Sequence, residues 1–298
     1  MYHRVLPEAD PFAIGALTVE QFRRQVEVLA QCFKVVSLEQ LITGLAHGRL
    51  PPGTACITFD DGYLDNYTFA YPILEQYNVP ATIFLASDVI GTNRILWHDR
   101  VLRAFKNTQV REFHYGDFSS HLFRLPDILA KQELALKLLE WLKQFAPAQR
   151  DHRISEILSR CEIDENRTSA ARLMLAWQEV REMHQNGITF GAHTKSHPIL
   201  ALLTREQKTE EIGASKRVIE DNLGAPVTTF AYPNGRAADF DDETKQILKQ
   251  ANFRCAVTTC HGLNTAESDP FEWRREQPWE TQPDKFLARL LWARLTEG

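Results

Sequence analysis

The sequence has few cysteines, and they do not follow the patterns in which cysteine builds a scaffold. The five cysteines among 298 residues are odd in number, scattered, and never spaced as CxxC. This distribution speaks against a disulfide framework. Cys32, Cys56 and Cys255 sit within apolar runs, and we expect them to be buried free thiols.

Long apolar runs and an excess of positive charge are missing too. No apolar stretch is long enough to span a bilayer. The N-terminal residues lack the apolar core of a secretory signal, which predicts a cytoplasmic protein, or a periplasmic or cell-surface one if the chain begins after a removed segment. The net charge is −5 and no basic stripe carries interleaved aromatics, so we expect no nucleic-acid partner.

Several common catalytic motifs are absent as well. The chain has no GxSxG, Walker A, GxGxxG or HExxH pattern. Their absence argues against serine hydrolases, NTPases, dinucleotide-binding enzymes and zincins.

What the sequence does contain is an alternation of short β-branched runs with amphipathic helical stretches. This alternation is typical of an α/β protein with a mostly parallel sheet and crossover helices. Thr18–Gln21 and Thr204–Gln207 fit the capping-box spacing at helix starts, while Asn186-Gly187 and Leu223-Gly224 predict helix ends. The expected strands are Phe33–Val36, Ala55–Phe59, Ala81–Leu85, Ile188–Ala192, Val227–Ala231 and Phe253–Val257.

The alternation stops between about Trp97 and Ala176. This stretch is charge-laced and mostly helical, with helices expected over Asp127–Phe145 and Arg150–Arg160 and a strand signal only at Val110–Tyr115. Because the alternation resumes afterwards, we expect a single catalytic domain over residues 1–298 with a helical insert at about 97–176.

Two adjacent carboxylates, Asp60 and Asp61, follow the expected strand Ala55–Phe59. Ionising both in a cleft of low dielectric constant is costly unless a cation or a donor compensates. Consecutive residues leaving a strand point in different directions, so the two side chains can have different roles. The alternative is a plain turn at the strand end, for which Asp-Asp-Gly is suitable chemistry.

A second polar cluster, His193-Thr-Lys-Ser-His197, follows the expected strand Ile188–Ala192. Sites in parallel α/β folds assemble at the carboxyl ends of strands, where both clusters fall. Histidine and aspartate together suit a divalent transition ion, and three protein ligands leave one position open. Pro198 disfavours helical geometry at His197, which indicates a compact turn. Surface histidines on a polar loop are the alternative.

Both clusters resemble motifs of a known family. Thr58-Phe-Asp-Asp-Gly62, followed by Tyr63-Leu-Asp-Asn-Tyr67, resembles the first motif of the polysaccharide deacetylases (carbohydrate esterase family 4, NodB-like). His193-Thr-Lys-Ser-His197-Pro resembles their second motif. The resemblance covers nearly all of the chain apart from the helical insert.

This resemblance implies a distorted (β/α) barrel of the polysaccharide deacetylase type with a helical insertion. It also implies that Asp60 is the general base and that Asp61, His193 and His197 hold Zn²⁺ or a similar divalent ion, with Co²⁺ or Ni²⁺ as alternatives. The chemistry agrees, because a divalent ion polarises an amide carbonyl and lowers the pKa of water.

The general acid departs from the family's commonest arrangement. The usual Leu-His motif near the C-terminus is missing. Tyr2-His3-Arg4-Val5 instead resembles the Tyr-His that opens circularly permuted members acting on exopolysaccharides of the poly-N-acetylglucosamine type. His3 is therefore the expected acid. His261 is its main competitor, although a turn histidine is the simpler interpretation of that residue.

Ala231-Tyr-Pro-Asn-Gly235 stands where the family's third motif falls, without the usual arginine before the proline. By analogy, the backbone N–H of Asn234 is a candidate oxyanion donor, and Tyr232 and Asn234 are candidate substrate-binding residues. A plain Pro-Asn-Gly turn is the alternative.

A loop near the C-terminus is expected to supply an arginine that orients the base, and tryptophans are candidates for sugar contacts. The arginine that orients the base is expected from Pro270–Arg275, with Arg275 preferred to Arg274 and a surface ion pair as the alternative. Aromatic rings in predicted loops or at strand ends can stack on sugars, although tryptophan is more often simply packed. These tryptophans are Trp97, which we favour as a substrate contact, Trp273 and Trp279.

Taken together, these features predict a metal-dependent hydrolase that removes N-acetyl groups from an N-acetylated sugar of a bacterial surface polysaccharide or its precursor. One alternative keeps the metal site but hydrolyses a non-sugar amide or cyclic imide. A non-catalytic carbohydrate-binding relative is the other, and the retention of Asp60 beside the three expected ligands argues against it, because a binding protein needs no base. The sequence leaves the oligomeric state open.

Overall fold

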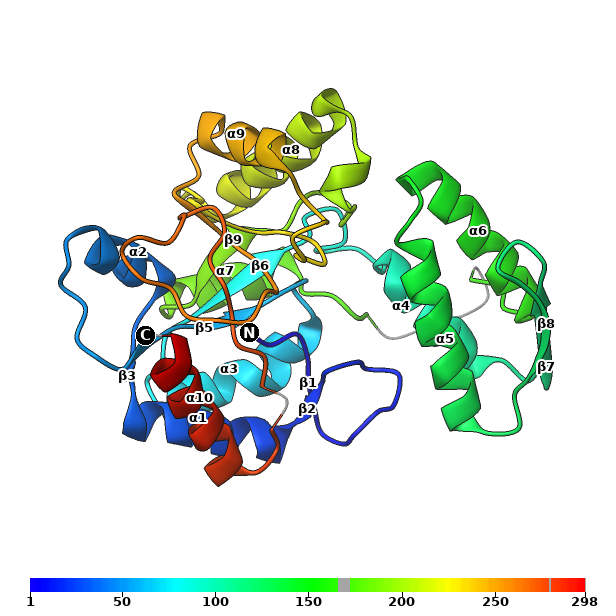
Figure 1. Cartoon of the computed structure of the whole chain (residues 1–298), viewed down its shortest axis with the longest axis horizontal. Coiled ribbons are helices and arrows are strands. Elements are labelled where there is room, and N and C mark those ends of the chain that lie inside the picture. The colour runs from blue at the N-terminus through cyan, green and yellow to red at the C-terminus, as the bar shows by residue number, and fades with distance from the viewer. Residues whose placement is uncertain (166–171, 279, 298) are drawn as a thin grey trace. The chain divides into compact units, whose positions relative to one another are not determined.

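Five parallel strands form the central sheet in the computed structural model, which describes residues 1–165, 172–278 and 280–297 (Figure 1). The strands lie in the order β11-β10-β9-β6-β5, and every pairing between them is parallel. Their bounds are β5 Ile57–Phe59, β6 Ala81–Leu85, β9 Thr189–Ala192, β10 Thr229–Ala231 and β11 Cys255–Val257.

Short segments extend this sheet at both edges. Tyr2 forms a parallel bridge with Phe59 of β5, and Trp273 forms one with Val257 of β11. Two further parallel pairs lie outside the central sheet, β1 (Val5–Leu6) with β2 (Leu17–Thr18) and β3 (Lys34–Val35) with β4 (Thr54–Ala55). The predicted α/β fold with a parallel sheet is thus confirmed, and each of the six expected strands is present.

Helices fill the connections between the strands. Capping boxes open α1 at Thr18 and α8 at Thr204 as predicted, and α8 ends at Gly224 in the left-handed conformation (φ 65°). Helices α7 and α8 both contact β9. The bounds are α1 Val19–Cys32, α2 Leu38–Ala46, the π-helical turn η1 Asn66–Ala70, α3 Tyr71–Gln76, α7 Trp177–Gln185, the 3₁₀ turn η2 Leu200–Leu202, α8 Arg205–Leu223, α9 Asp242–Gln250 and α10 Pro283–Glu297.

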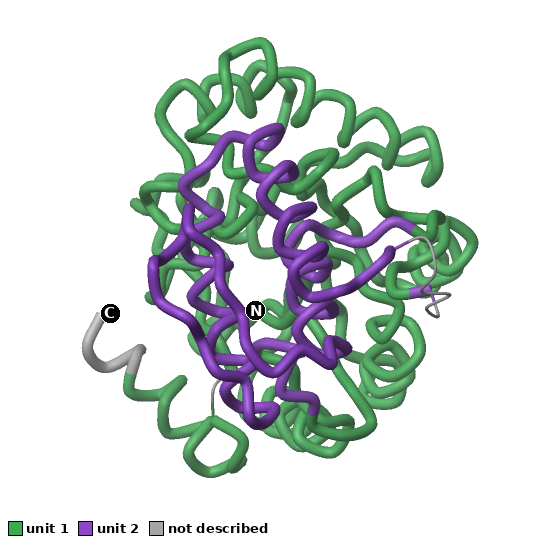
Figure 2. The backbone as a smooth tube through the Cα atoms, turned by 90° about the vertical axis from the view of Figure 1, so that its right-hand side faces the viewer, with its two compact units in different colours: residues 1–9, 15–93, 173–298 green, residues 10–14, 94–172 purple. Residues whose placement is uncertain are grey.

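The contacts divide the chain into two compact units (Figure 2). The first holds residues 1–9, 15–93 and 173–298, and the second holds residues 10–14 and 94–172. The second unit was expected as an insert at about 97–176, of which residues 166–171 lie outside the described residues. That the whole chain forms a single catalytic domain stays a prediction.

The second unit has an apolar core of its own, to which Trp97, Phe105, Leu138 and Ile157 contribute. The sequence suggested that Trp97 lies in a loop or at a strand end, but it is the first residue of α4. The helices and strands of the second unit are α4 Trp97–Asn107, β7 Glu112–Tyr115, β8 Ser119–Arg124, α5 Ile128–Leu142 and α6 Pro147–Arg160.

All five cysteines are free thiols. Cys255 is buried as expected and Cys56 is half-buried, but Cys32 is exposed, so the expectation of burial was wrong for that residue. Cys32 is the last residue of α1, beyond Leu29, the last residue that this helix buries. Among the described residues, no helix combines the length and apolar character needed to cross a membrane.

Candidate metal centre and its surroundings

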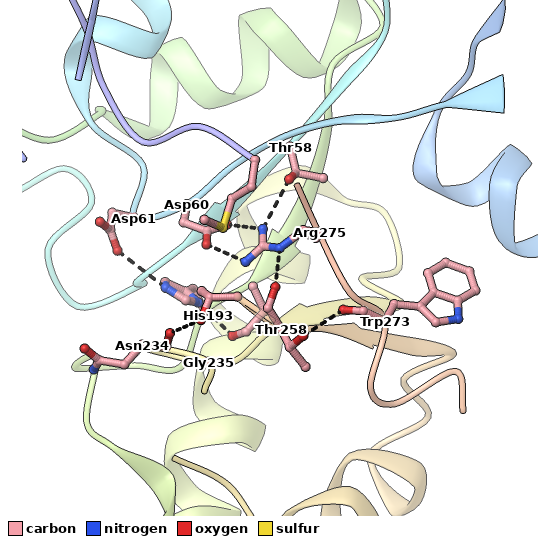
Figure 3. A network of polar contacts seen from close by, with 12 residues as sticks. Thr58, Asp60, Asp61, His193, Asn234, Gly235, Thr258, Trp273 and Arg275 are labelled. Carbon is pink, nitrogen blue, oxygen red and sulfur yellow. Dashed lines mark hydrogen bonds and ion pairs between the residues drawn. The ribbon is translucent and has the colours of Figure 1, made fainter. Parts of the chain in front are cut away.

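The two adjacent aspartates leave the end of β5 in different directions. Asp61 adopts a positive φ of 76°, which is unfavourable for a residue with a side chain, and Gly62 follows with φ 83°. Asp60 faces Arg275 and Asp61 faces His193, as Figure 3 shows. Both carboxylates are buried, with exposed fractions of 1% and 3%. The turn thus separates two buried acids that would otherwise repel each other.

Asp61, His193 and His197 lie together in a buried group. The Oδ1 atom of Asp61 is 3.4 Å from Nε2 of His193 and 3.3 Å from Nε2 of His197. One ligand atom from each of the three residues lies within 4.8 Å of the others. One carboxylate oxygen and two imidazole nitrogens are the donors that a divalent transition ion prefers. These residues therefore fit the ion that the sequence predicts.

A backbone contact orients the ring of His193. Its Nδ1 lies 2.7 Å from the carbonyl oxygen of Ala231, so Nδ1 carries the proton and Nε2 faces Asp61. Burial by itself lowers the pKa of His193, but the hydrogen bond with Asp61 and the charges of Asp60 and Asp61 raise it overall. The two carboxylates therefore make the surroundings of this ring negative.

The loop between the two histidines is compact, as predicted. Thr194 and His197 both have positive φ values, 62° and 61°. The Thr194 hydroxyl accepts a hydrogen bond from the backbone N–H of His197 at 3.1 Å. The Glu211 carboxylate of α8 accepts the backbone N–H groups of Lys195 and Ser196 at 2.9 and 2.8 Å, and the Ser196 hydroxyl at 2.7 Å. Helix α8 thereby fixes the loop that carries both histidines.

Asp60 is bound by the guanidinium group of Arg275. The two side chains form parallel hydrogen bonds of 2.8 and 2.7 Å, and Arg275 also donates to Thr58 Oγ1 and to the Thr258 carbonyl. Burial alone raises the pKa of Asp60, but the charge and hydrogen bonds of Arg275 outweigh it and bring the pKa to about 2. Arg274 is exposed, and its backbone exchanges hydrogen bonds with Asn264. These contacts support the choice of Arg275.

His3 lies among these groups although it is near the N-terminus. The bridge between Tyr2 and β5 places it there, since the Asp60 N–H donates to the Tyr2 carbonyl at 3.0 Å. Burial lowers the pKa of the His3 imidazole, and the charges of Asp61 and Asp60 oppose that shift. His261 has a half-exposed side chain whose Nδ1 is 3.7 Å from Glu276. The geometry therefore favours His3 over His261 as a participant in the site.

The segment after β10 forms a tight turn. Asn234 and Gly235 have positive φ values of 61° and 68°, and the Asn234 carbonyl accepts a hydrogen bond from the Thr259 hydroxyl at 2.7 Å. A Cβ atom at position 235 would lie 2.9 Å from the Thr259 nitrogen, so the turn requires glycine.

Tyr232 and the tryptophans differ from the predicted pattern of substrate contacts. Tyr232 is fully buried, and its hydroxyl donates to the Phe271 carbonyl at 2.9 Å, so its side chain offers no surface to a sugar. Trp97 and Trp273 are 5% and 4% exposed, and the Arg150 guanidinium covers the Trp97 ring. Their packing leaves little area for stacking. Trp279 lies outside the described residues.

Sequence reasoning missed the residues that support the site. Glu211, Thr258 and the Ala231 carbonyl orient the loop, the arginine and the first histidine. Glu211 is one of several glutamates on α8, and backbone carbonyls carry no sequence signal. Their roles emerge only from the spatial arrangement.

Comparisons with known proteins agree with this arrangement. A family model described as polysaccharide deacetylase matches residues 47–256. The chain is 23% identical to the Bacillus subtilis protein YxkH over 226 residues, which are 75% of this chain and 52% of that protein. It is 27% identical over 180 residues to the poly-β-1,6-N-acetyl-D-glucosamine N-deacetylase of Staphylococcus epidermidis, covering 59% of this chain and 60% of that enzyme. It thus spans little more than half the length of these two relatives.

Solved structures share the fold. The Streptococcus pyogenes deacetylase PplD in complex with acetate has a TM-score of 0.64 and 21% identity, with 97% of this chain and 95% of that chain covered. IcaB from Ammonifex degensii has a TM-score of 0.63 and 20% identity, with coverage of 98% and 94%. The expected distorted barrel with a curled parallel sheet is therefore confirmed.

Proposed function

The chain belongs to the polysaccharide deacetylase family, and from that premise we propose that it removes N-acetyl groups from an N-acetylated sugar by metal-dependent hydrolysis. The observation that carries the proposal is the buried group of Asp61, His193 and His197 beside the arginine-bound Asp60. The named activity of the Staphylococcus epidermidis relative supports a bacterial surface polysaccharide, or its precursor, as the substrate.

Asp61, His193 and His197 would hold the divalent ion, for which Zn²⁺ is the first candidate. When bound, the ion polarises the acetamide carbonyl and lowers the pKa of water. The Ala231 carbonyl keeps Nε2 of His193 available as a ligand atom. All three residues are buried, with exposed fractions of 5% or less.

Asp60 would act as the general base. Its carboxylate stays ionised because Arg275 holds its pKa at about 2 against the effect of burial. Each carboxylate oxygen that accepts from Arg275 retains a second lone pair, so Asp60 can also accept a proton from the attacking water. Arg275 thus orients the base without occupying all of its acceptor capacity.

The remaining steps need an oxyanion donor and an acid. The backbone N–H of Asn234 is the proposed donor to the oxygen of the attacked carbonyl. His3 is the proposed acid, which gives a proton to the amine nitrogen as the C–N bond breaks. The oxygen of the water ends in the carboxyl group of acetic acid, which ionises to acetate, and the sugar leaves with a free amine. Asp60 then releases its proton and His3 regains one, so that both side chains return to their starting state.

Replacing Asp60 by asparagine tests the proposal. The purified variant is assayed for acetate release from N-acetylglucosamine oligomers and for bound metal. Loss of acetate release with metal retained supports a hydrolase with Asp60 as its base. Undiminished release from the variant would refute that role.

A further inference from the structure

The two residues Asp65 and Asn66, a few positions after the metal-site aspartate, bind the N-terminal segment that carries His3. Asp65 accepts a hydrogen bond from Nε of Arg4 at 2.8 Å and another from the Val5 N–H at 3.0 Å. The side-chain amide of Asn66 donates to the carbonyl oxygen of His3 at 2.8 Å. Three consecutive residues of the N-terminal segment are therefore bound by two consecutive side chains.

Both of these side chains are buried. Asp65 is 5% exposed and Asn66 is 1% exposed. A buried carboxylate or amide is costly to the fold unless it is bound by a donor or acceptor. The Arg4 guanidinium also lies over the ring of Tyr63, 4.8 Å from its centroid. The ion pair of Arg4, the hydrogen bond from the Asn66 side chain and the ring contact together hold the N-terminal segment in one place.

The other side of His3 is fixed by the sheet. The Tyr2 N–H donates to the Thr58 carbonyl at 2.8 Å, and the Tyr2 carbonyl accepts from the Asp60 N–H at 3.0 Å. Backbone pairing thus fixes the residue before His3, and Asp65 fixes the two residues after it. The position of the imidazole relative to Asp60 depends on both.

From this arrangement we infer that Asp65 and Asn66 are positioning residues for His3. The inference rests on the proposed role of His3 as general acid. Neither residue need touch the substrate, since both bind Arg4, Val5 or the backbone of His3. The turn that carries the proposed ligand Asp61 thus continues into a segment that holds the proposed acid in place. A displacement of about 1 Å can cost a catalytic group roughly 10²-fold in rate.

The test compares Asp65→Asn with the wild type and with Tyr67→Phe as a matched control. Tyr67 lies in the same segment, but its hydroxyl bonds to exposed Glu182. Each zinc-loaded protein is measured for kcat and KM on N-acetylglucosamine oligomers, for metal content, and for the NMR signals of isotope-labelled histidine rings. The His3 signals are assigned by their loss in His3→Gln.

We expect Asp65→Asn to lower kcat by at least about tenfold, with KM and metal content unchanged. The His3 signals should shift, whereas those of His193 and His197 and the kinetics of Tyr67→Phe should match the wild type. Unchanged His3 signals, or a loss of kcat that follows a loss of metal, would overturn the inference.

Two further variants keep the outcomes distinct. If Asp65→Asn does not fold, Arg4→Gln tests the same ion pair from its more exposed side, where the arginine side chain is 18% exposed and the aspartate 6%. Full acetate release by His3→Gln would refute His3 as the acid and the inference with it. An inactive His3→Gln beside a fully active Asp65→Asn would refute the positioning role alone.

Discussion

Arg275 and Asp60 form a bidentate ion pair across 215 positions of sequence, with both partners buried. Burial acts to raise the pKa of the Asp60 carboxyl, and Arg275 reverses that effect, so the pKa falls from 3.8 to about 2. The carboxylate is therefore ionised at every pH above about 3. The stability that the pair contributes is fully present above the unfolded pKa of 3.8 and is lost as the pH falls from there through the folded pKa of about 2.

The first prediction concerns the pH dependence of catalysis. Replacing Arg275 by methionine removes the strongest of the effects that oppose burial, so the pKa of Asp60 rises and the acidic limb of the kcat/KM profile moves to higher pH. Arg274→Met is the matched control, because Arg274 is exposed and only its backbone bonds to Asn264. An acidic limb that stays in place in Arg275→Met would mean that this arginine does not tune the base.

The second prediction separates the two adjacent aspartates. Asp60→Asn should reduce kcat by about 10²- to 10⁴-fold while the protein still binds one metal ion. Asp61→Asn should lose metal affinity and activity together, since Asp61 is one of the three proposed ligands. Metal titration by calorimetry and acetate release measure the two effects. Equal losses of metal in both variants would contradict the division of roles.

The third prediction concerns the loop that carries both histidines. Glu211→Gln replaces one acceptor oxygen by an NH₂ group, which cannot accept a hydrogen bond from the N–H groups or the hydroxyl of the loop. Supporting residues of this kind typically contribute about 10- to 100-fold to metal affinity. The neighbouring Glu210→Gln is the control, since Glu210 is exposed and faces Arg217 at 3.7 Å. Equal metal affinity in both variants would show that the loop needs no such support.

The fourth prediction concerns Tyr232. Removing its hydroxyl leaves the Phe271 carbonyl without this donor, so Tyr232→Phe should lower the free energy of unfolding by about 1 kcal/mol. Because the ring is buried, KM should not change. Urea unfolding and steady-state kinetics on the same preparation measure both quantities. A raised KM with unchanged stability would restore Tyr232 as a substrate contact.

The sequence predicted those features that depend on residues close together in the chain. Strand-forming runs end directly in Asp60 and His193, so the sheet, the strand ends and the residues of the candidate site could be predicted together. Capping boxes at Thr18 and Thr204 marked helix starts because hydroxyl and amide groups satisfy free N–H groups locally.

Other features depend on packing that a single sequence does not show. Helix α4 starts after Leu96 without a side-chain cap, so nothing marked Trp97 as its first residue. The strands β1 and β2 are two residues long, too short for a period to emerge. The burial of Tyr232 follows from Phe240 stacking on its ring at 3.9 Å. Such contacts are set by distant parts of the chain.

Metal content and acetate release, measured together on one preparation before and after chelation, test the central claim most directly. The substrates are N-acetylglucosamine oligomers of several lengths, with a non-sugar amide for comparison. We predict one bound ion per chain and acetate release from the oligomers that stops on chelation and returns with Zn²⁺ or Co²⁺. Acetate release that is undiminished by complete removal of metal, or a protein that binds no divalent ion, would contradict the role assigned to Asp61, His193 and His197.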